Sequence, residues 1–246
     1  MNDKKYLMNK LIKFIPNLIT LTNLLFGIFA VIFAMSGWFQ LSGMMIAVAA
    51  VFDFLDGFAA RLLKATSGLG KELDSLSDMV SFGLAPGLLL YNMIEHYRGD
   101  EMEYVSYLAL LVPLFSAYRL AKFNVDERQS DRFFGLPTPA NALVIASFPW
   151  IASQSFVLYG LFTNPLMTWI TNPAFLGIYA LLFSILLVVD LPLFALKVKT
   201  FTWNDNKLVY SFLIFSLLSL AALHFVALPW IIVIYILLSI VDNVRG

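Results

Sequence analysis

The chain has 246 residues, of which 60% are hydrophobic and 13% are charged, and its mean hydropathy is +0.82. This composition is too apolar for a soluble domain and indicates a multi-span membrane protein, organised as one integral membrane domain over 1–246. A formal net charge of zero suggests no nucleic-acid partner, and the absence of cysteine excludes disulfides, zinc-thiolate sites and a thiol nucleophile.

Eight stretches of the sequence approach the roughly 20 apolar residues that a membrane-spanning helix needs. In chain order they are about 17–36, 42–62, 74–94, 104–122, 138–158, 174–194, 208–223 and 225–242. Only the region around His224 separates the last two, so they need a very tight turn, although one long bent helix or a re-entrant pair also fits. We expect an all-α polytopic membrane helix bundle with about eight transmembrane helices, comprising a six-helix core at 15–194 and a C-terminal helical pair at 195–246.

The basic residues predict the orientation of these spans. If the N-terminus lies in the cytoplasm, every Lys and Arg residue except Arg98 falls in or beside a cytoplasmic segment. Cytoplasmic loops of membrane proteins carry such an excess of positive charge. The charge distribution therefore supports the eight-span topology independently of hydropathy.

Four aspartates follow a regular spacing in the stretch DFLDGFAARLLKATSGLGKELDSLSD, from Asp53 to Asp78. Asp53 and Asp56 lie three residues apart near the end of the second span, and Asp74 and Asp78 lie four apart at the start of the third. Each pair therefore projects from one helical face. Because the loop between the spans is short, the two helices should pack as a hairpin. We expect the four carboxylates to converge just below the cytoplasmic surface.

Such a cluster of acids needs a counter-charge, because each unpaired buried charge costs several kcal/mol and like charges repel. Carboxylate oxygens are hard ligands that suit Mg²⁺ or Mn²⁺. Two such ions about 4 Å apart are a common device for phosphoryl transfer. The aspartates therefore predict a divalent-metal site.

Small and basic residues accompany the aspartates. Three small residues would let a base or a pyrophosphate approach the helix backbones closely: Gly57, Ala60 and Gly70. Arg61 and Lys64 could neutralise phosphate oxygens. In a simpler interpretation, Asp53 and Asp56 only pair with these two cations at the membrane interface. Four acids on two helices, with small residues between them, favour a functional site.

The complete pattern resembles the signature of the CDP-alcohol phosphotransferases, and this chain fills every position of it. The matching residues are Asp53, Asp56, Gly57, Ala60, Arg61, Gly70, Asp74 and Asp78. The resemblance implies a CDP-linked donor and two divalent cations, Mg²⁺ or Mn²⁺. It implies that Asp53, Asp56 and Asp74 serve chiefly as metal ligands and that Asp78 is the general base and a further ligand. The implied donor-binding residues are Asp56, Gly57, Ala60, Arg61, Gly70 and Asp74.

The first span carries a second part of the resemblance. The stretch IPNLITLTNLLFG places Asn17, Thr20 and Asn23 at helical spacing. Similar Pro-Asn, Thr and Asn positions in the family lie close to the CDP site. The resemblance therefore adds Asn23 to the donor-binding residues and Thr20 as a candidate phosphate or serine contact.

A third stretch, YRLAKFNVDERQSDRFFGLPTPANA at 118–142, resembles the membrane-embedded bacterial phosphatidylserine synthases, which are a branch of this family. Lys122 stands where an Arg is usual, which keeps the charge but loses the bidentate fork. We therefore favour Arg119 over Lys122 as a contact for a phosphate or a carboxylate. Alternatively, GLPTPA is a plain loop, and the two cations are positive-inside anchors.

The resemblance implies an enzyme that transfers the phosphatidyl group from CDP-diacylglycerol to the hydroxyl of L-serine, giving phosphatidylserine and CMP. It would lie among the membrane lipids of a bacterial inner membrane, with its active site facing the cytoplasm. One alternative is another acceptor, glycerol 3-phosphate or inositol phosphate. An alternative from a different class is a cation transporter that uses the intramembrane acids.

Some polar and small residues lie outside these motifs. Gly83 and Gly87 form a G-x-x-x-G pair, which would mark a helix contact or the seam of an expected homodimer. His96 and His224 lack metal-ligand spacing. Asp190 and Asp242 lie near predicted cytoplasmic span ends, where an interface position is expected.

Overall fold

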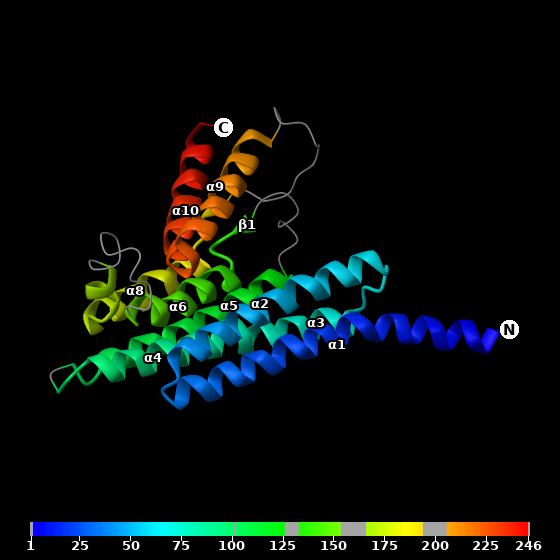
Figure 1. Cartoon of the computed structure of the whole chain (residues 1–246). Coiled ribbons are helices and arrows are strands. Elements are labelled where there is room, and N and C mark those ends of the chain that lie inside the picture. Colours follow the sequence, from blue (N-terminus) through cyan, green and yellow to red (C-terminus); the bar gives the residue numbers. More distant parts are fainter. Residues whose placement is uncertain (1, 101, 126–132, 154–165, 194–205, 246) are drawn as a thin grey trace.

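The computed structural model describes residues 2–100, 102–125, 133–153, 166–193 and 206–245. The α-helices are α1 (Asn2–Met35), α2 (Phe39–Leu62), α3 (Gly68–Asp78), α4 (Ala85–Tyr97), α5 (Leu111–Val125), α6 (Thr138–Ala152), α8 (Pro173–Val188), α9 (Lys207–Leu223) and α10 (Ala227–Arg245). A π-helix, η1 (Met79–Leu84), and two 3₁₀ segments, η2 (Val105–Leu110) and η5 (His224–Val226), join some of them. The strands are β1 (Phe133–Phe134) and β2 (Pro192–Leu193), and Figure 1 shows the whole arrangement.

The prediction of an all-α polytopic membrane bundle is confirmed. Within the described ranges, each of the eight predicted spans contains a helix, although the predicted span 138–158 can be followed only as far as residue 153. The predicted span 174–194 is too long, because α8 ends at Val188 and residues 192–193 form strand β2. In the part of the chain that the structure describes, five helical stretches are long and apolar enough to cross a membrane: Phe14–Met35, Phe39–Leu62, Gly68–Tyr97, Val105–Val125 and Lys207–Val241. The basic residues expected at 126–132 and 194–205 lie outside the described residues.

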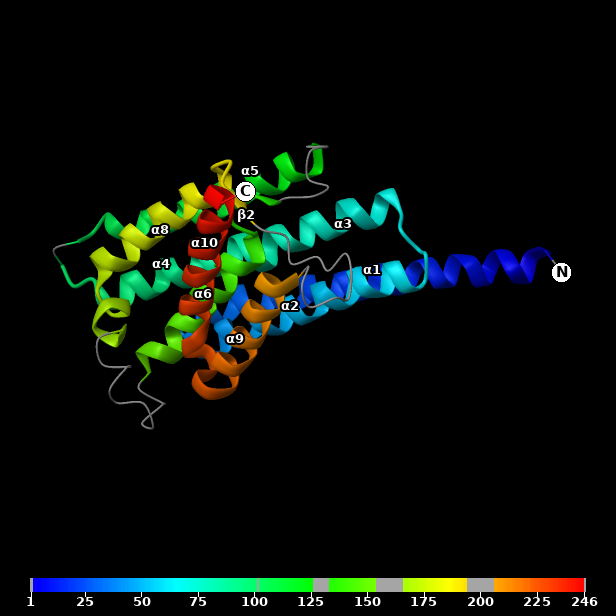
Figure 2. The ribbon, with the colours of Figure 1, turned by 90° about the horizontal axis from the view of Figure 1, so that it is seen from above.

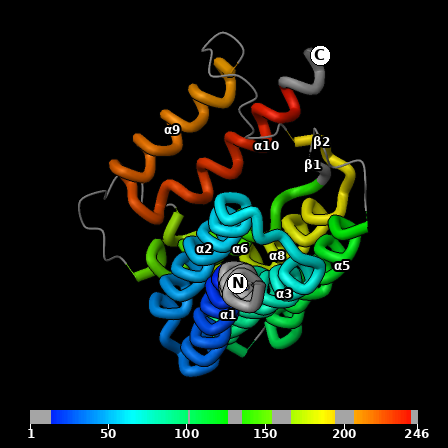
Figure 3. Tube along the Cα trace, turned by 90° about the vertical axis from the view of Figure 1, so that its right-hand side faces the viewer, coloured from blue at the N-terminus to red at the C-terminus, as the bar shows by residue number. Residues whose placement is uncertain are grey.

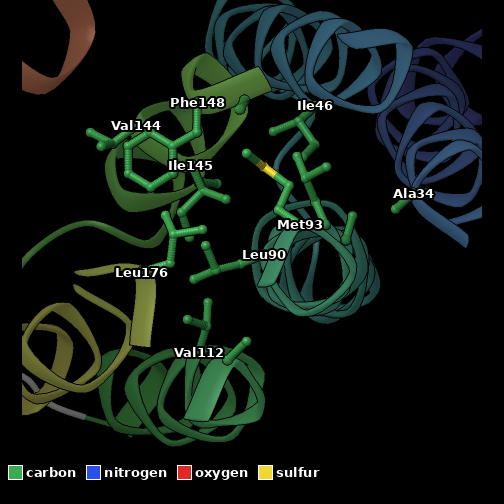
Figure 4. Packing of buried hydrophobic residues seen from close by; sticks show 14 of the residues in the cluster. Ala34, Ile46, Leu90, Met93, Val112, Val144, Ile145, Phe148 and Leu176 are labelled. Atoms are coloured by element: carbon green, nitrogen blue, oxygen red, sulfur yellow. The ribbon is translucent and has the colours of Figure 1, made fainter. Parts of the chain in front are cut away.

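Apolar side chains cover the outside of the bundle as well as its centre. Leu25 and Phe29 on α1 and Phe54 and Phe58 on α2 are exposed, as expected for helices that face lipid. In the centre, apolar side chains from α2, α4, α5, α6 and α8 meet, as Figure 4 shows. The labelled residues in the middle of that cluster are Ile46, Leu90, Met93, Val112, Ile145, Phe148 and Leu176.

The third span is one continuous 30-residue helical stretch with a local change of winding. It begins at Gly68 because the Ser67 side chain caps the helix and accepts a hydrogen bond from the Gly70 backbone N–H at 3.0 Å. Six residues of π-helix then follow Asp78 directly. Such π segments often occur at functional sites. The start of the helix lies six residues before the predicted one, because two glycines together with Lys71 and Glu72 lower the mean hydropathy of 68–73.

Gly83 and Gly87 make a helix contact within this chain. A Cβ at Gly83 would lie 3.1 Å from Ser116 Cβ, and a Cβ at Gly87 would collide with the Pro113 ring. Both neighbours belong to α5. The G-x-x-x-G pair therefore lets α5 approach closely, and it does not supply the homodimer seam that the sequence suggested.

The C-terminal helices α9 and α10 form an antiparallel pair, and this confirms the two-element interpretation of 208–242. His224, with φ of 51° and ψ of −133°, ends α9, and α10 begins three residues later. In Figures 1 and 2 the pair runs across the direction of α1–α5. The C-terminal pair thus packs over one face of the bundle, a placement that hydropathy did not predict.

A short β-ribbon connects this pair to the bundle. Phe133 pairs with Leu193 and Phe134 with Pro192 in antiparallel register. Leu193 is buried together with Phe212 of α9 and Tyr235 of α10. The ribbon lies between α10 and the bundle in Figure 3. The segment that leads into α6 is therefore held directly beneath α10.

Candidate active site

The largest part of the candidate site is a pocket of about 570 Å³ beside the aspartates. Its walls come from α1, α2, the loop after α2, and the start of α3. The lining residues are Pro16, Asn17, Thr20, Asp56, Gly57, Ala60, Ala65, Thr66, Ser67, Gly68, Gly70, Lys71 and Asp74. A volume of this size suits a nucleotide-sized ligand. Five of the seven predicted donor-binding residues therefore line one pocket.

Three of the four aspartates meet closely. Asp53, Asp56 and Asp74 each offer a carboxylate oxygen, and these oxygens all lie within 4.8 Å of one another. Asp56 is 5% exposed, and its Oδ2 atom has no hydrogen-bond partner among the described residues. The three carboxylates meet because α2 and α3 each pack against α1, whereas the sequence had suggested that these two helices pack directly on each other as a hairpin. Hard oxygen donors crowded in this way fit a divalent cation.

Asp78 lies one helical turn beyond Asp74. Its carboxyl group is within hydrogen-bonding reach of Asp53, and Asn23 Nδ2 donates to Asp78 Oδ1 at 3.4 Å. Asn23 is fully buried, and its backbone carbonyl accepts a hydrogen bond from Ser81 Oγ at 3.2 Å. The predicted donor-binding residue Asn23 is thus a neighbour of Asp78 and does not line the pocket.

The other predicted residues surround the pocket in different ways. Gly57 leaves open space, since the nearest atoms to a Cβ there belong to the Arg61 guanidinium at 3.9 Å. Arg61 is exposed at the end of α2. Thr20 is buried beside Asp56, and its hydroxyl donates to the Pro16 carbonyl at 3.0 Å. A side chain at Gly70 would approach Asn17 Oδ1 to 3.1 Å.

Arg119 and Lys122 point to different partners. Arg119 is 8% exposed, and its Nη1 donates to Thr138 Oγ1 at 3.1 Å. Lys122 is more exposed and forms an ion pair with Asp190, with Nζ to Oδ1 at 2.6 Å. Asp190, expected only at an interface, therefore ties the end of α8 to α5. Of the two predicted contacts, Arg119 alone is buried.

Several residues of this region were not predicted from the sequence. Ser67, Thr66 and Lys71 line the pocket, and Lys71 Nζ also donates to the Asn124 carbonyl at 3.2 Å. Asn124 Nδ2 donates to Ser75 Oγ at 2.8 Å, which joins α5 to α3. Of these residues, only Ser67 could have been recognised from the sequence, as a helix-capping serine before the helix that carries Asp74 and Asp78.

The chain is similar to known proteins over most of its length. The family model of CDP-alcohol phosphatidyltransferases matches residues 13–186. A CDP-diacylglycerol–serine O-phosphatidyltransferase of Helicobacter pylori strain J99 is 34% identical over 206 residues, which is 82% of this chain and 80% of the relative. The protein of the same name from Methanocaldococcus jannaschii is 29% identical over 232 residues, covering 94% and 95%.

A third relative is an archaetidylserine synthase of Methanothermobacter thermautotrophicus, 35% identical over 153 residues, covering 60% of this chain and 61% of the relative. The segment matched by the family model holds all four aspartates, every residue that lines the pocket, and Arg119. The chain belongs to the CDP-alcohol phosphatidyltransferase family.

Proposed function

We propose that this protein transfers the phosphatidyl group of CDP-diacylglycerol to L-serine, producing phosphatidylserine and CMP. The observation that carries this proposal is the group of three carboxylates within 4.8 Å of one another on the wall of a nucleotide-sized pocket. The names of the relatives, two serine O-phosphatidyltransferases and an archaetidylserine synthase, support serine as the acceptor.

Two divalent cations, Mg²⁺ or Mn²⁺, fit the oxygen donors of this cluster. Asp53, Asp56 and Asp74 would hold them, with Asp78 as a further ligand. When bound, such cations neutralise the pyrophosphate and the charge that develops on the leaving CMP. Asp56, Gly57, Ala60, Gly70 and Asp74 would bind the donor from the pocket side, with Asn23 behind the aspartates and Arg61 at the rim.

The reaction is a direct displacement at phosphorus. The hydroxyl oxygen of serine forms a bond to the phosphorus that carries diacylglycerol, and the hydroxyl proton passes to the Asp78 carboxylate. The bond from this phosphorus to the bridging oxygen breaks, and its electron pair leaves with CMP. Thr20, Arg119 and Lys122 are candidate contacts for the phosphate or for serine.

The position of the cluster favours an enzyme over a cation transporter. Asp53 and Asp56 lie in the last turns of α2, and Asp74 lies in the second turn of α3. A transporter would place its acids near the bilayer midplane between broken helices. The ends of these helices suit a site at the inner leaflet of a bacterial inner membrane, open to the cytoplasm.

A homodimer is also part of the proposal, although it needs a contact other than the G-x-x-x-G pair. The exposed apolar faces of α1 and α2 supply area for one. The mass of the protein in detergent micelles tests this, and a monomer would contradict it.

The test of the function is CMP release from CDP-diacylglycerol by the purified protein, with serine, glycerol 3-phosphate and inositol phosphate compared as acceptors. We expect the fastest release with serine, loss of release in chelator and recovery with Mg²⁺ or Mn²⁺. Faster release with another acceptor would overturn the choice of serine, and full turnover without metal would overturn the metal mechanism.

A further inference from the structure

Arg119 lies opposite Asp78, on the side of the aspartates away from the donor pocket. Gly87 faces Pro113, and Gly83, one turn earlier, faces Ser116. The next turn of the same antiparallel contact brings Asp78 to Arg119. Arg119 and Asp78 indeed interact electrostatically. None of the residues that line the donor pocket belongs to α5, α6 or α10.

The Arg119 guanidinium is buried, and no carboxylate in the described part of the chain forms an ion pair with it, although Asp78 acts on it electrostatically. In the described part of the chain, the ion pairs are Arg98 with Glu95 and Lys122 with Asp190, and neither involves Arg119. Its Nε atom has no hydrogen-bond partner among those residues. A buried cation of this kind is costly unless an anion completes its surroundings. The arrangement therefore suits a bound anionic ligand.

Helix α10 brings a second hydrogen-bond donor to the same side. Tyr235 is 6% exposed, its ring lies 5.5 Å from that of Phe212, and it interacts electrostatically with Arg119. Strand β2 packs against α10 and pairs with β1, which leads into Thr138. Figure 3 shows α10 above this ribbon. Arg119, Thr138 and Tyr235 thus border one buried region next to Asp78.

We propose that Tyr235 determines acceptor specificity by binding, together with Arg119, the carboxylate of the amino-acid acceptor. This inference rests on the proposed function. A carboxylate only accepts hydrogen bonds, and a guanidinium and a phenol O–H both donate them. A carboxylate held there leaves the hydroxyl of the same small molecule on the side of Asp78, which takes its proton.

The position of Tyr235 in the chain agrees with a role in acceptor choice. The family model ends at residue 186, so it includes the aspartates and the donor pocket but not α10. The donor is common to the reaction class, whereas the alcohol varies. A selective contact for one alcohol is therefore expected from a segment outside the common core.

The experiment compares the wild-type chain with Tyr235→Phe, which removes one hydroxyl and keeps the ring. Initial rates of CMP release are measured with L-serine and CDP-diacylglycerol varied separately, and with serinol, which lacks the carboxylate, as acceptor or as competitor of serine. We expect the KM for serine to rise about tenfold or more, because a hydrogen bond to a charged group is lost. The KM for CDP-diacylglycerol should stay the same as in the wild-type chain. The KM of serinol as acceptor, or its inhibition constant as competitor, should also stay the same.

Tyr118→Phe is the matched control, because Tyr118 is next to Arg119 in sequence but is exposed on the outside of α5. It should behave as wild type. Tyr235→His keeps a ring and an N–H donor, so it should retain more serine preference than Tyr235→Phe, and it provides a second variant should the first not fold.

Two results would overturn the inference alone, given a wild-type chain that uses serine. One is an unchanged KM for serine in Tyr235→Phe. The other is an equal loss for serine and serinol, which indicates a purely structural role. A wild-type chain that releases no CMP with serine would instead overturn the proposed function, and the inference with it.

Discussion

Asp56 is the most buried member of the carboxylate cluster, and it belongs to both the proposed metal site and the proposed donor pocket. Asp56→Asn keeps the shape of the side chain but removes a ligand charge. We expect affinity for Mg²⁺ or Mn²⁺ to fall about tenfold or more, together with affinity for the donor. The metal-dependent rise in unfolding temperature measures this.

The control for Asp56→Asn is Glu72→Gln, since Glu72 is an exposed acid on α3 outside the cluster. It removes the same charge from the neighbouring helix and should leave the metal-dependent stabilisation intact. Equal stabilisation of both variants by metal would show that Asp56 is no ligand.

Asp78 should behave differently from the three clustered aspartates, because it faces Asn23 and the Arg119 side. Asp78→Asn cannot accept the serine proton. We expect kcat to fall by about 10²- to 10⁴-fold, with a much smaller loss of donor affinity than in Asp56→Asn. Donor titration and single-turnover rates separate the two effects. If kcat and donor affinity fall to the same extent in Asp78→Asn as in Asp56→Asn, Asp78 acts only as a further ligand and not as the base.

For individual residues, the sequence predicted which side chains lie together only where those residues are close in the chain. Asp53 with Asp56, and Asp74 with Asp78, are separated by three and four positions, so helical geometry alone puts each pair on one face. Tyr235 follows Arg119 by more than a hundred positions and belongs to no motif. Only the packing of α10 through β2 brings them together, and no local pattern encodes that contact.

Among the elements, the close contact between α1 and the π-helix η1 fixes the turn that follows Asp78. Gly27 faces Ser81, and an added Cβ would overlap Ser81 Oγ and lie 2.9 Å from Ser81 Cα. We expect Gly27→Ala to destabilise the protein by about 1–3 kcal/mol through overpacking, and to lower activity because η1 begins directly after Asp78, the proposed general base. Thermal unfolding in detergent measures the first effect.

Gly68→Ala serves as the stability control for this contact, since a Cβ there meets nothing within 4 Å and Ala favours the helix. It should be as stable as wild type or slightly more stable. If Gly27→Ala unfolds at the same temperature as Gly68→Ala, helix α1 does not constrain η1.

Hydropathy located the helices that the structure describes, but it could not orient them. It measures the length and polarity of a segment, so it predicted α9 and α10 as two more spans in the bundle. The crossed direction in Figure 1 depends on the tight turn at His224 and on the ribbon Phe133–Phe134 with Pro192–Leu193. The π-helix also escaped prediction, because its residues, MVSFGL, continue the apolar helix pattern without a break.

For the molecule as a whole, the proposed function requires that both substrates reach one end of the bundle. The lipid donor arrives within the membrane, and serine arrives from water. The aspartates lie near the loop between α2 and α3, whereas Arg98 and Gly99 follow the far end of α4. The site is therefore accessible to cytoplasmic serine only if the loop between α2 and α3 is on the cytoplasmic side.

The charge distribution predicts this orientation, and the absence of cysteine makes it directly measurable. Thr66 lies in the loop between α2 and α3, and Asp100 lies in the loop after α4; both are exposed. Single variants Thr66→Cys and Asp100→Cys are treated with a membrane-impermeant thiol reagent in intact cells and in inverted vesicles. We expect Asp100→Cys to react in cells and Thr66→Cys only in inverted vesicles, while the cysteine-free parent reacts in neither.

Because Thr66 also lines the donor pocket, CDP-diacylglycerol should slow the labelling of Thr66→Cys. Labelling of Thr66→Cys from outside intact cells would place the aspartates on the wrong side for cytoplasmic serine and would contradict the predicted topology.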